Sequence, residues 1–317
     1  MSLYLVTGGA GFIGSHITEE LLHRGERVRV LDNFSTGKRE NLHFPHLQTQ
    51  VKTLLEIVEG DIREPDSVRA AMQGIDYVLH QAALPSIARS VADPITSNDV
   101  NVNGTLNVLV AARDAKVKLF VYASSSSIYG NTSTLPKHEK MQMQPISPYA
   151  VSKLAGERYC VAFHNVYKLP IVCLRYFNVF GPRQDPNSQY SGVIPKFITA
   201  MLRGEAPVIY GDGMQSRDFT YVENIVKANL LACKRQEAIG HVINIAGGES
   251  YTLLDLYHNL AGLIGRTCDP IFSDARIGDI KHSFAAIELA KLKLGYIREI
   301  DWLIGLRKTV DWYSTRN

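Results

Sequence analysis

Short apolar runs alternate with helical patterns through the first half of the chain, and this alternation constrains the fold more than any other feature. The apolar runs cover residues 4–7, 27–32, 55–59, 77–80, 119–123 and 171–176. Helical patterns fall between them, near residues 13–24, 65–72, 94–114 and 148–167. Runs that are apolar on both faces are typical of strands in a parallel sheet that helices cover on both sides. The sequence therefore predicts an α/β fold with a doubly wound parallel sheet.

The pattern changes after Tyr176, because residues 178–191 are rich in Pro, Gly, Asn and Gln. Such a stretch predicts a long loop at a domain border. Beyond it, helices are expected at 193–203, 222–235 and 253–262, and short strands at 208–210 and 241–245. We therefore expect a first domain over residues 1–178 and a smaller mixed α/β domain over 179–317, with parts of 217–245 returning to the first.

The composition excludes several classes of protein. With 34 Lys and Arg against 31 Asp and Glu, the formal charge is only +3, which argues against a nucleic-acid partner bound by bulk charge. No apolar run approaches the ~20 residues that cross a bilayer, and no basic region typical of a signal peptide precedes the first strand. We expect a cytoplasmic protein without a metal site or a membrane partner. Four scattered cysteines are expected to be buried thiols: Cys160, Cys173, Cys233 and Cys268.

A glycine-rich turn follows the first predicted strand and opens the first predicted helix. Gly8, Gly11 and Gly14 have the spacing G-x-x-G-x-x-G, with Gly9 in addition. Gly8 and Gly11 permit a tight turn that approaches a pyrophosphate closely, and Gly14 lets the helix touch the strand. The helix N-terminus offers N–H groups and a positive dipole end to the anion. The pattern predicts a dinucleotide site in preference to a purely structural turn.

Residues at other strand ends fit the same cofactor. Asp32 ends the second strand and favours NAD over NADP, because a carboxylate binds ribose hydroxyls and repels a 2′-phosphate. Lys38 and Arg39 lie near enough to weaken that preference. Asp61 could bond the adenine amino group, or equally could cap the helix that begins at Pro65. The third and fourth strand ends add Ile62, Gln81, Ala82 and Ala83.

Tyr149 and Lys153 stand four residues apart, so a helix that begins near Pro148 would place both side chains on one face. A free phenol has a pKa of about 10, which a neighbouring ammonium and a positive nicotinamide ring would lower. Tyr149 would then be a usable acid/base for a hydroxyl group. The alternative is an exposed Tyr and Lys on a helix surface.

Four consecutive serines, at positions 124–127, end the fifth predicted strand. Strand alternation would point Ser125 and Ser127 one way and Ser124 and Ser126 the other. A hydroxyl near Tyr149 could relay a proton or bond the reacting oxygen.

Together these segments resemble the extended short-chain dehydrogenase/reductase family, and within it the nucleotide-sugar 4-epimerases. The resemblance covers nearly the whole chain and implies a Rossmann-type NAD-binding domain followed by a nucleotide-sugar-binding domain. It implies that Tyr149 is the acid/base, that Lys153 holds the nicotinamide ribose and that Ser125 assists, with Ser126 and Ser127 leaving the last assignment open. The motifs that carry it are the glycine turn, Asp32-Asn33, the serines before Tyr129-Gly130, Tyr149-x-x-x-Lys153 and Arg175-Tyr176-Phe177-Asn178.

The same resemblance extends the sets of ligand-contacting residues. The further cofactor residues are Phe12, Ile13, Asn33, Ser35, Gly37, Asn101 and Tyr176. The implied substrate residues are Ser86, Ser125, Tyr149, Asn178, Val193, Lys196, Arg217, Arg276, Asp279 and Ser283. Arg217 and Arg276 resemble the arginines that bind the substrate diphosphate, and a guanidinium fork suits two phosphate oxygens.

Three departures within the family guide the choice of substrate. Ser126 and Ser127 stand where the dehydratases carry Asp-Glu, and Asn178 stands where uronate-specific members usually carry Thr. Ser283 replaces the bulky Tyr of glucose-restricted epimerases and would leave room for an N-acetyl group. The resemblance therefore favours 4-epimerisation of UDP-N-acetylglucosamine and UDP-N-acetylgalactosamine. The alternatives are a UDP-glucose 4-epimerase, another UDP-sugar enzyme of the family, or a non-catalytic NAD sensor on the same fold.

In the implied reaction, the Tyr149 phenolate removes the 4-hydroxyl proton while the hydride at carbon 4 passes to NAD. The hydride then returns to the other face of the 4-keto sugar, and NAD is retained. The family also implies a homodimer through the helices near 94–114 and 148–167. Surface polysaccharide assembly is a natural consumer of such sugars.

Overall fold

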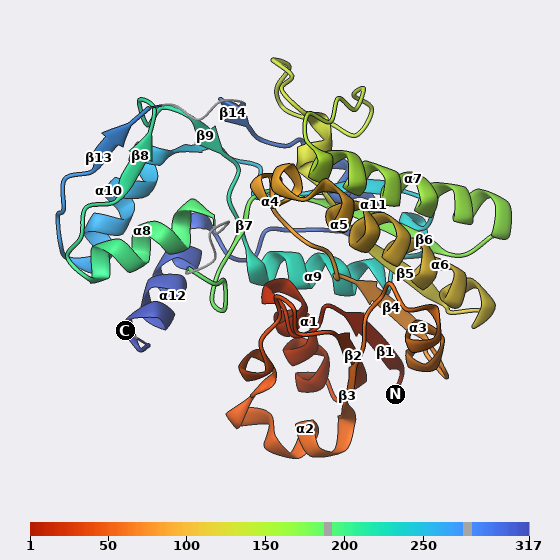
Figure 1. The fold of residues 1–317 in the computed structure, drawn as a ribbon. Helices are drawn as coiled ribbons and strands as arrows, with labels where there is room; N and C mark the ends of the chain where they lie inside the picture. The colour runs from red at the N-terminus through yellow and green to blue at the C-terminus, as the bar shows by residue number, and fades with distance from the viewer. Residues whose placement is uncertain (187–191, 275–280, 317) are drawn as a thin grey trace.

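The computed structural model describes residues 1–186, 192–274 and 281–316, and its centre is a seven-stranded parallel sheet (Figure 1). The strand order is β11-β6-β5-β4-β1-β2-β3. This arrangement confirms the predicted doubly wound α/β fold. The strands are β1 (Leu3–Thr7), β2 (Arg27–Asp32), β3 (Leu55–Glu59), β4 (Tyr77–His80), β5 (Leu119–Ser125), β6 (Ile171–Tyr176) and β11 (Val242–Ile245).

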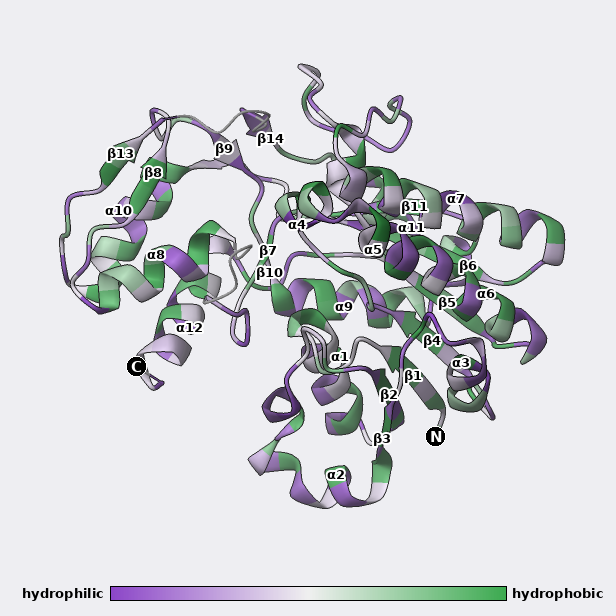
Figure 2. Ribbon diagram, viewed as in Figure 1, coloured by the Kyte–Doolittle hydropathy of each residue, from purple (hydrophilic) through white to green (hydrophobic). Residues whose placement is uncertain are grey.

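Alternate residues of the strands enter two different cores, which is why the strands are apolar on both faces. Val6 and Val172 pack on the side of α1 (Phe12–His23) and α9 (Val222–Ala232). Leu5 and Phe120 pack on the side of α3 (Pro65–Ala71), α6 (Thr105–Asp114) and α7 (Pro148–Tyr167). In Figure 2 the central strands are mainly green, whereas outer helices such as α6 and α7 alternate between green and purple.

The second half of the chain builds a smaller region beside the sheet. Its core contains Phe197, Ile209, Leu256, Trp302 and other apolar side chains. Figure 1 shows its elements gathered at one side of the sheet, above and around the C-terminus. They are α8 (Val193–Leu202), α10 (Leu253–Ile264), α12 (Trp302–Ser314), β8 (Val208–Tyr210), β9 (Ser216–Arg217), β12 (Tyr251–Thr252), β13 (Ile271–Ser273) and β14 (His282–Ser283).

The helix expected at 94–114 is confirmed over its whole length, as α5 (Pro94–Asn98), a π-helical turn (Asp99–Gly104) and α6. Two other sequence predictions require correction. The loop expected at 178–191 contains a short strand, β7 (Val179–Phe180), because that segment pairs with β10 (Thr220–Tyr221). Cys233 and Cys268 are only partly buried, although all four thiols are free.

Several elements have no counterpart in the sequence prediction, and apart from α12 each of them is short. They are α2 (Gln48–Leu54), α4 (Ile87–Ala92), α11 (Glu288–Leu294), α12 and the 3₁₀ turns Arg39–Leu42, Pro45–Leu47, Ser126–Tyr129 and Gln236–Ala238. Within the residues that the structure describes, no helix is long and apolar enough to cross a membrane. In the same residues, no group of three or more His, Cys, Asp or Glu side chains could hold a metal ion.

A buried ion pair joins α7 to the sheet. Glu157 is fully buried, Arg175 is 2% exposed, and their side chains meet at 2.8 Å. Ser124 Oγ donates to the same carboxylate at 2.8 Å, and Arg175 donates to the hydroxyl of Tyr129 at 2.7 Å. Tyr129 in turn donates to the amide oxygen of Asn244 at 2.7 Å. The network therefore connects α7 with β5, β6 and β11.

Glu157→Ala is expected to destabilise the protein by about 3–5 kcal/mol, because it leaves the Arg175 charge buried without its partner. Urea denaturation measures the change. Glu299→Ala is the control, since it removes an exposed 2.7 Å ion pair with Lys227 and should cost less than about 1 kcal/mol. Equal losses in the two variants would contradict the role of the buried pair.

Candidate active site

A cavity of about 910 Å³ lies at the carboxyl ends of the sheet strands, and its volume is within the range of cofactor pockets, roughly 300–1,000 Å³. In open α/β sheets, ligands bind at this end of the strands. The structure brings most of the sequence-predicted cofactor residues together in its lining, with Ser86 from the substrate set. These are Gly8, Gly11, Phe12, Ile13, Gly14, Asp32, Asn33, Ser35, Gly37, Asp61, Ile62, Gln81, Ala82, Ala83, Tyr149, Lys153 and Tyr176.

The glycine turn needs glycine at two positions. Gly8 has φ +69°, and a Cβ there would lie 2.8 Å from the backbone of Ala82. A Cβ on Gly14 would lie 2.1 Å from the carbonyl oxygen of Gly8. The first turn of α1 carries no acidic residue, so no carboxylate in that turn competes with a bound anion for its free N–H groups. The backbone is therefore shaped to receive an anionic group such as a pyrophosphate.

Asp32 is held by the backbone on both sides. Its Oδ2 accepts from Ala10 N at 2.9 Å and its Oδ1 accepts from Phe34 N at 2.8 Å. Burial raises the pKa of Asp32, and these two bonds oppose that effect. A carboxylate has about four acceptor sites, so two remain for ribose hydroxyls. A Cβ on Gly37 would lie 2.9 Å from both carboxylate oxygens, so a side chain there would crowd that position.

The two cations near Asp32 are both paired. Arg39 bonds Glu59 and stacks on the ring of Phe34, 4.0 Å from its centroid. Lys38 lines the cavity and pairs with Asp185 at 3.5 Å. The arrangement fits a cofactor without a 2′-phosphate.

Asp61 does not cap the following helix, so that alternative is wrong. The N-cap residue of α3 is Glu64, and its side chain makes no capping bond. Asp61 instead pairs with Arg63 at 2.7 Å and accepts from Asn33 Nδ2 at 2.8 Å. The pKa of Asp61 is lowered to about 2, and the hydrogen bond from Arg63 is the main cause.

Asn101 lies behind the cavity wall, in the π-helical turn. Its amide oxygen accepts from Leu84 N at 2.7 Å, and its amide nitrogen donates to Leu84 O at 3.2 Å and Ser152 Oγ at 3.0 Å. Leu84 lines the cavity. Asn101 therefore fixes the wall against α7.

The start of α7 positions Tyr149 and Lys153 over the cavity. Pro148 stands in the first turn, and the hydroxyl of Ser147 caps the helix by accepting from Ala150 N at 3.2 Å. Lys153 Nζ donates to Ala123 O at 2.9 Å, and burial lowers the pKa of Lys153 to about 8.

Burial is the main influence on the phenol in this structure. It raises the pKa of Tyr149, and a hydrogen bond with Ser125 lowers that pKa. The serine run is not a continuous strand, so the predicted alternation is wrong beyond Ser125, where a 3₁₀ turn begins. Ser124 is buried and donates to Glu157, whereas Ser127 donates to Ser125 at 2.9 Å. Ser125 is therefore the serine that the structure joins to Tyr149.

Apart from Ser86 and Tyr149, the predicted substrate residues that the structure describes are not part of this cavity's lining. Arg217 of β9 pairs with Ser283 of β14, and the Ser283 residue is only 5% exposed. Asn178 donates to the carbonyl oxygen of Asp218 at 3.2 Å. Val193 and Lys196 lie in the first turns of α8. Arg276 and Asp279 fall outside the described residues.

Sequence reasoning missed Asp218 and Arg183. Asp218 accepts backbone N–H bonds from Gly247, Gly248 and Ala285 at 2.8–3.2 Å, and burial raises the pKa of Asp218 to about 7. Arg183 lines the cavity from the predicted loop. Neither carries a local signal, because each acts through partners distant in the sequence.

A Rossmann-type sheet with this glycine turn, a held carboxylate at the end of β2 and a Tyr–Lys pair in the cavity lining is the arrangement of a dinucleotide-binding protein. Residues 4–246 match the family model described as the NAD dependent epimerase/dehydratase family. The chain belongs to this family. The predicted membership of the extended short-chain dehydrogenase/reductases, as an enzyme dependent on NAD, is thereby confirmed.

Similar proteins extend over the whole chain. The UDP-glucose 4-epimerase of Mycolicibacterium smegmatis is 36% identical over 315 residues, covering 99% of each chain. The UDP-N-acetylglucosamine 4-epimerase of Methanobrevibacter ruminantium, solved with UDP-N-acetylmuramic acid, is 42% identical with a TM-score of 0.94, covering 100% of this chain and 99% of that one. The UDP-glucose 4-epimerase of Thermotoga maritima, solved with UDP-glucose, is 36% identical with a TM-score of 0.93, covering 99% of each chain.

Gly14→Ala is expected to weaken NAD binding by about tenfold or more, because the added methyl must displace the Gly8 carbonyl. Calorimetric titration with NAD measures the loss. Gly262→Ala in α10 is the control, since a Cβ there meets nothing within 4 Å and should stabilise the helix by up to about 1 kcal/mol. Unchanged NAD affinity in Gly14→Ala would refute the role given to the turn.

Proposed function

We propose that this chain is an NAD-dependent 4-epimerase of UDP-sugars. The observation that carries the proposal is that Tyr149 and Lys153, from the start of α7, line the same cavity as the glycine turn and Asp32. Membership of the NAD dependent epimerase/dehydratase family and the names of its similar proteins support the same activity.

The residues present fit the cofactor. The glycine turn and the N-terminus of α1 would hold its pyrophosphate, Asp32 the adenosine ribose and Lys153 the nicotinamide ribose. When bound, NAD supplies the hydride acceptor and donor that redox exchange at carbon 4 requires.

Tyr149 moves the proton of the 4-hydroxyl group. As a phenolate it takes that proton when the carbon is oxidised, and as a phenol it returns the proton when the carbon is reduced. The Ser125 hydroxyl favours the phenolate by hydrogen bonding to it. Burial opposes ionisation, so the Ser125 bond and the positive charge of the bound nicotinamide together set the pKa at which Tyr149 works.

The substrate side would hold the diphosphate through Arg217 and Arg276, and the rest of the nucleotide and sugar through Asn178, Val193, Lys196, Ser86 and Asp279. We propose N-acetylated hexoses as the preferred sugars, because Ser283 is small and stands directly opposite Arg217. The second candidate is UDP-glucose and UDP-galactose, which the names of two similar proteins favour.

The test is product analysis with purified protein, UDP-N-acetylglucosamine and UDP-glucose being supplied in separate reactions. The 4-epimer is expected from the N-acetylated substrate, with no net formation of NADH. Stoichiometric NADH without a galacto product would reject the epimerase assignment. Turnover of UDP-glucose alone would instead reject the assignment of the sugar.

Tyr149→Phe is expected to lower turnover by about 10²–10⁴-fold, because it removes the acid/base while keeping the ring. NAD affinity, measured by titration, should remain that of the parent protein. A variant that retains full turnover would exclude Tyr149 as the acid/base, and a parent protein that binds NAD without turnover would favour a sensor.

Ser125→Ala is expected to shift the lower limb of the kcat/KM profile toward higher pH. The hydrogen bond with Ser125 lowers the pKa of Tyr149, so its loss raises that pKa, and the phenolate then forms only in more alkaline solution. Activity at neutral pH should fall and recover partly at alkaline pH. Ser126→Ala decides between the two serines, because a shift confined to that variant would assign the role to Ser126.

We also propose a homodimer through the helices expected near 94–114 and 148–167, which are α5 to α6 and α7, with the adjoining α4 taking part. These helices lie together in Figure 1 and expose apolar side chains to solvent, at 49% for Ile87, 65% for Val91, 82% for Ile95, 51% for Val151 and 69% for Val166. Monomers rarely leave such a surface uncovered. Light scattering at micromolar concentration should give twice the 35.3 kDa chain mass, and a single chain mass would reject the dimer.

A further inference from the structure

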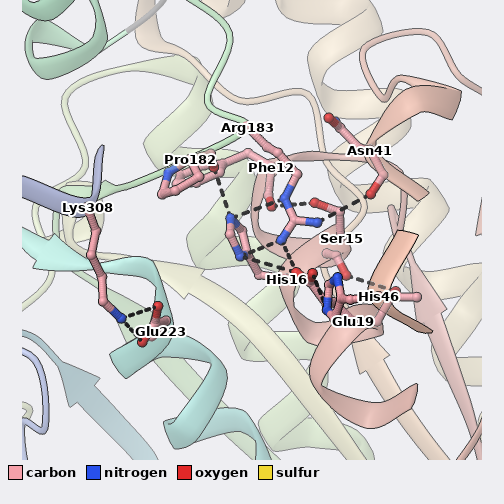
Figure 3. Close-up of polar contacts among 12 residues, drawn as sticks. Phe12, Ser15, His16, Glu19, Asn41, His46, Pro182, Arg183, Glu223 and Lys308 are labelled. Atoms are coloured by element: carbon pink, nitrogen blue, oxygen red, sulfur yellow. Dashed lines mark hydrogen bonds and ion pairs between the residues drawn. The ribbon is translucent and has the colours of Figure 1, made fainter. Parts of the chain in front are cut away.

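Arg183 reaches across from the loop after β7 to the helix that begins at the glycine turn. Its side chain is one-tenth exposed and lines the cavity. Figure 3 shows it pointing into a group formed by His16, Glu19 and Asn41. His16 and Glu19 belong to α1, and Asn41 belongs to the 3₁₀ turn after β2.

The guanidinium bonds three residues of the nucleotide-binding half. It donates to His16 Nδ1 at 2.6 Å, to the carboxylate of Glu19, and to Asn41 O at 3.4 Å. His16 Nε2 lies 2.9 Å from Pro182 O, the carbonyl just before Arg183. Each bond joins the loop to a segment more than a hundred residues away in the sequence.

The chemistry of His16 agrees with this geometry. Burial and the neighbouring Arg183 lower the pKa of His16 to about 3, so the ring is neutral in neutral solution. The contact with Pro182 O then assigns the proton to Nε2, which leaves Nδ1 to accept from Arg183. At its two shortest contacts the histidine therefore bonds the loop once as donor and once as acceptor, and Arg183 Nε also lies 3.4 Å from Nε2.

The residues that follow Arg183 are tied down as well. Asp185 pairs with Lys38 at 3.5 Å, and the carbonyl of Gln184 accepts from the hydroxyl of Tyr313 in α12. Gln184 and Asp185 also line the cavity. The loop is thus fixed between the two halves of the protein, with one wall of the cavity on it.

The backbone of Arg183 has φ +64°, in the left-handed region that a residue with a side chain seldom adopts. Such a conformation costs about 1–3 kcal/mol and persists only where the surroundings hold it. The bonds to α1 and Asn41 supply that hold.

We propose that Arg183 is a positioning residue that clamps residues 182–185 to α1 and thereby retains the dinucleotide in its cavity. The inference rests on the proposed function, because a 4-epimerase must keep the reduced cofactor in place between two hydride transfers. The clamp holds the part of the cavity wall formed by Arg183, Gln184 and Asp185 against α1, so its loss is expected to free that part of the wall.

The experiment measures cofactor retention in the full chain without any UDP-sugar. Protein loaded with NAD is desalted, and the NAD that remains bound is quantified over time. In Arg183→Gln, NAD dissociation is expected to be about tenfold faster or more, because hydrogen bonds to a charged group are lost. Arg183→Lys, which keeps the charge without the fork, should recover part of the retention.

Lys308→Gln is the matched control. It removes an ion pair with Glu223 at 2.9 Å that also joins two elements and is drawn in Figure 3, but neither residue lines the cavity. This variant should retain NAD like the parent protein. Equal retention in Arg183→Gln and Lys308→Gln would overturn the proposal.

Glu19→Gln keeps the test decisive if Arg183→Gln fails to fold. Glu19 does not line the cavity, so an accelerated loss of NAD in this variant cannot come from a lost contact with the cofactor and supports the clamp, whereas unchanged retention would overturn the proposal. His46→Ala is the accompanying control, because it removes another partner of Glu19 and should retain NAD like the parent protein. During turnover, NADH that escapes to solvent can be trapped by an added NADH-consuming dehydrogenase. The clamp predicts that more NADH is trapped with the clamp variants than with the parent protein. It also predicts that these variants raise the apparent KM for added NAD by a larger factor than they lower kcat. The NAD-retention measurement uses no UDP-sugar, so its result tests the clamp even if the protein catalyses a different sugar reaction.

Discussion

The buried ion pair between Glu157 and Arg175 is the interaction on which the site depends. Glu157 belongs to the same helix as Tyr149 and Lys153, and Arg175 belongs to β6, one residue before Tyr176 in the cavity wall. The carboxylate also holds Ser124, the neighbour of Ser125. A low-dielectric interior makes a broken pair costly, so this bond fixes the phenol relative to its serine within narrow limits.

Desolvation gives the cavity its chemical character. It raises the pKa of Asp32 and Tyr149 and lowers that of Lys153, so each group is less charged than it would be in water. Bound charges then act on these groups more strongly than they would in solvent. The protein contributes a dry, fixed set of donors and acceptors, and the redox chemistry belongs to the cofactor.

Local sequence signals predicted most of the sheet and the cofactor wall, but little of what joins the two halves. The six strands carry continuous apolar runs, and Ser147 with Pro148 marks the start of α7, so both could be read from neighbouring residues. The strand at Val179 and the contacts of Arg183 depend on pairings with distant segments, whereas the turn at Ser126 is a local 3₁₀ turn that the Ser125 hydroxyl caps. A single sequence holds no periodic trace of such pairings, which is why the short strand Val179–Phe180 inside the predicted loop was missed.

The position of β11 at the edge of the sheet has a consequence for how the chain can fold. This strand pairs with β6 along Val242–Ile245, and α9 covers Val172 and Leu174 from the same side. A polypeptide ending at residue 178 would lack both elements and would expose that apolar face with an unpaired strand edge. The two regions are therefore not separable by cleavage at this point, and the sheet should form cooperatively only when the later segment has been synthesised.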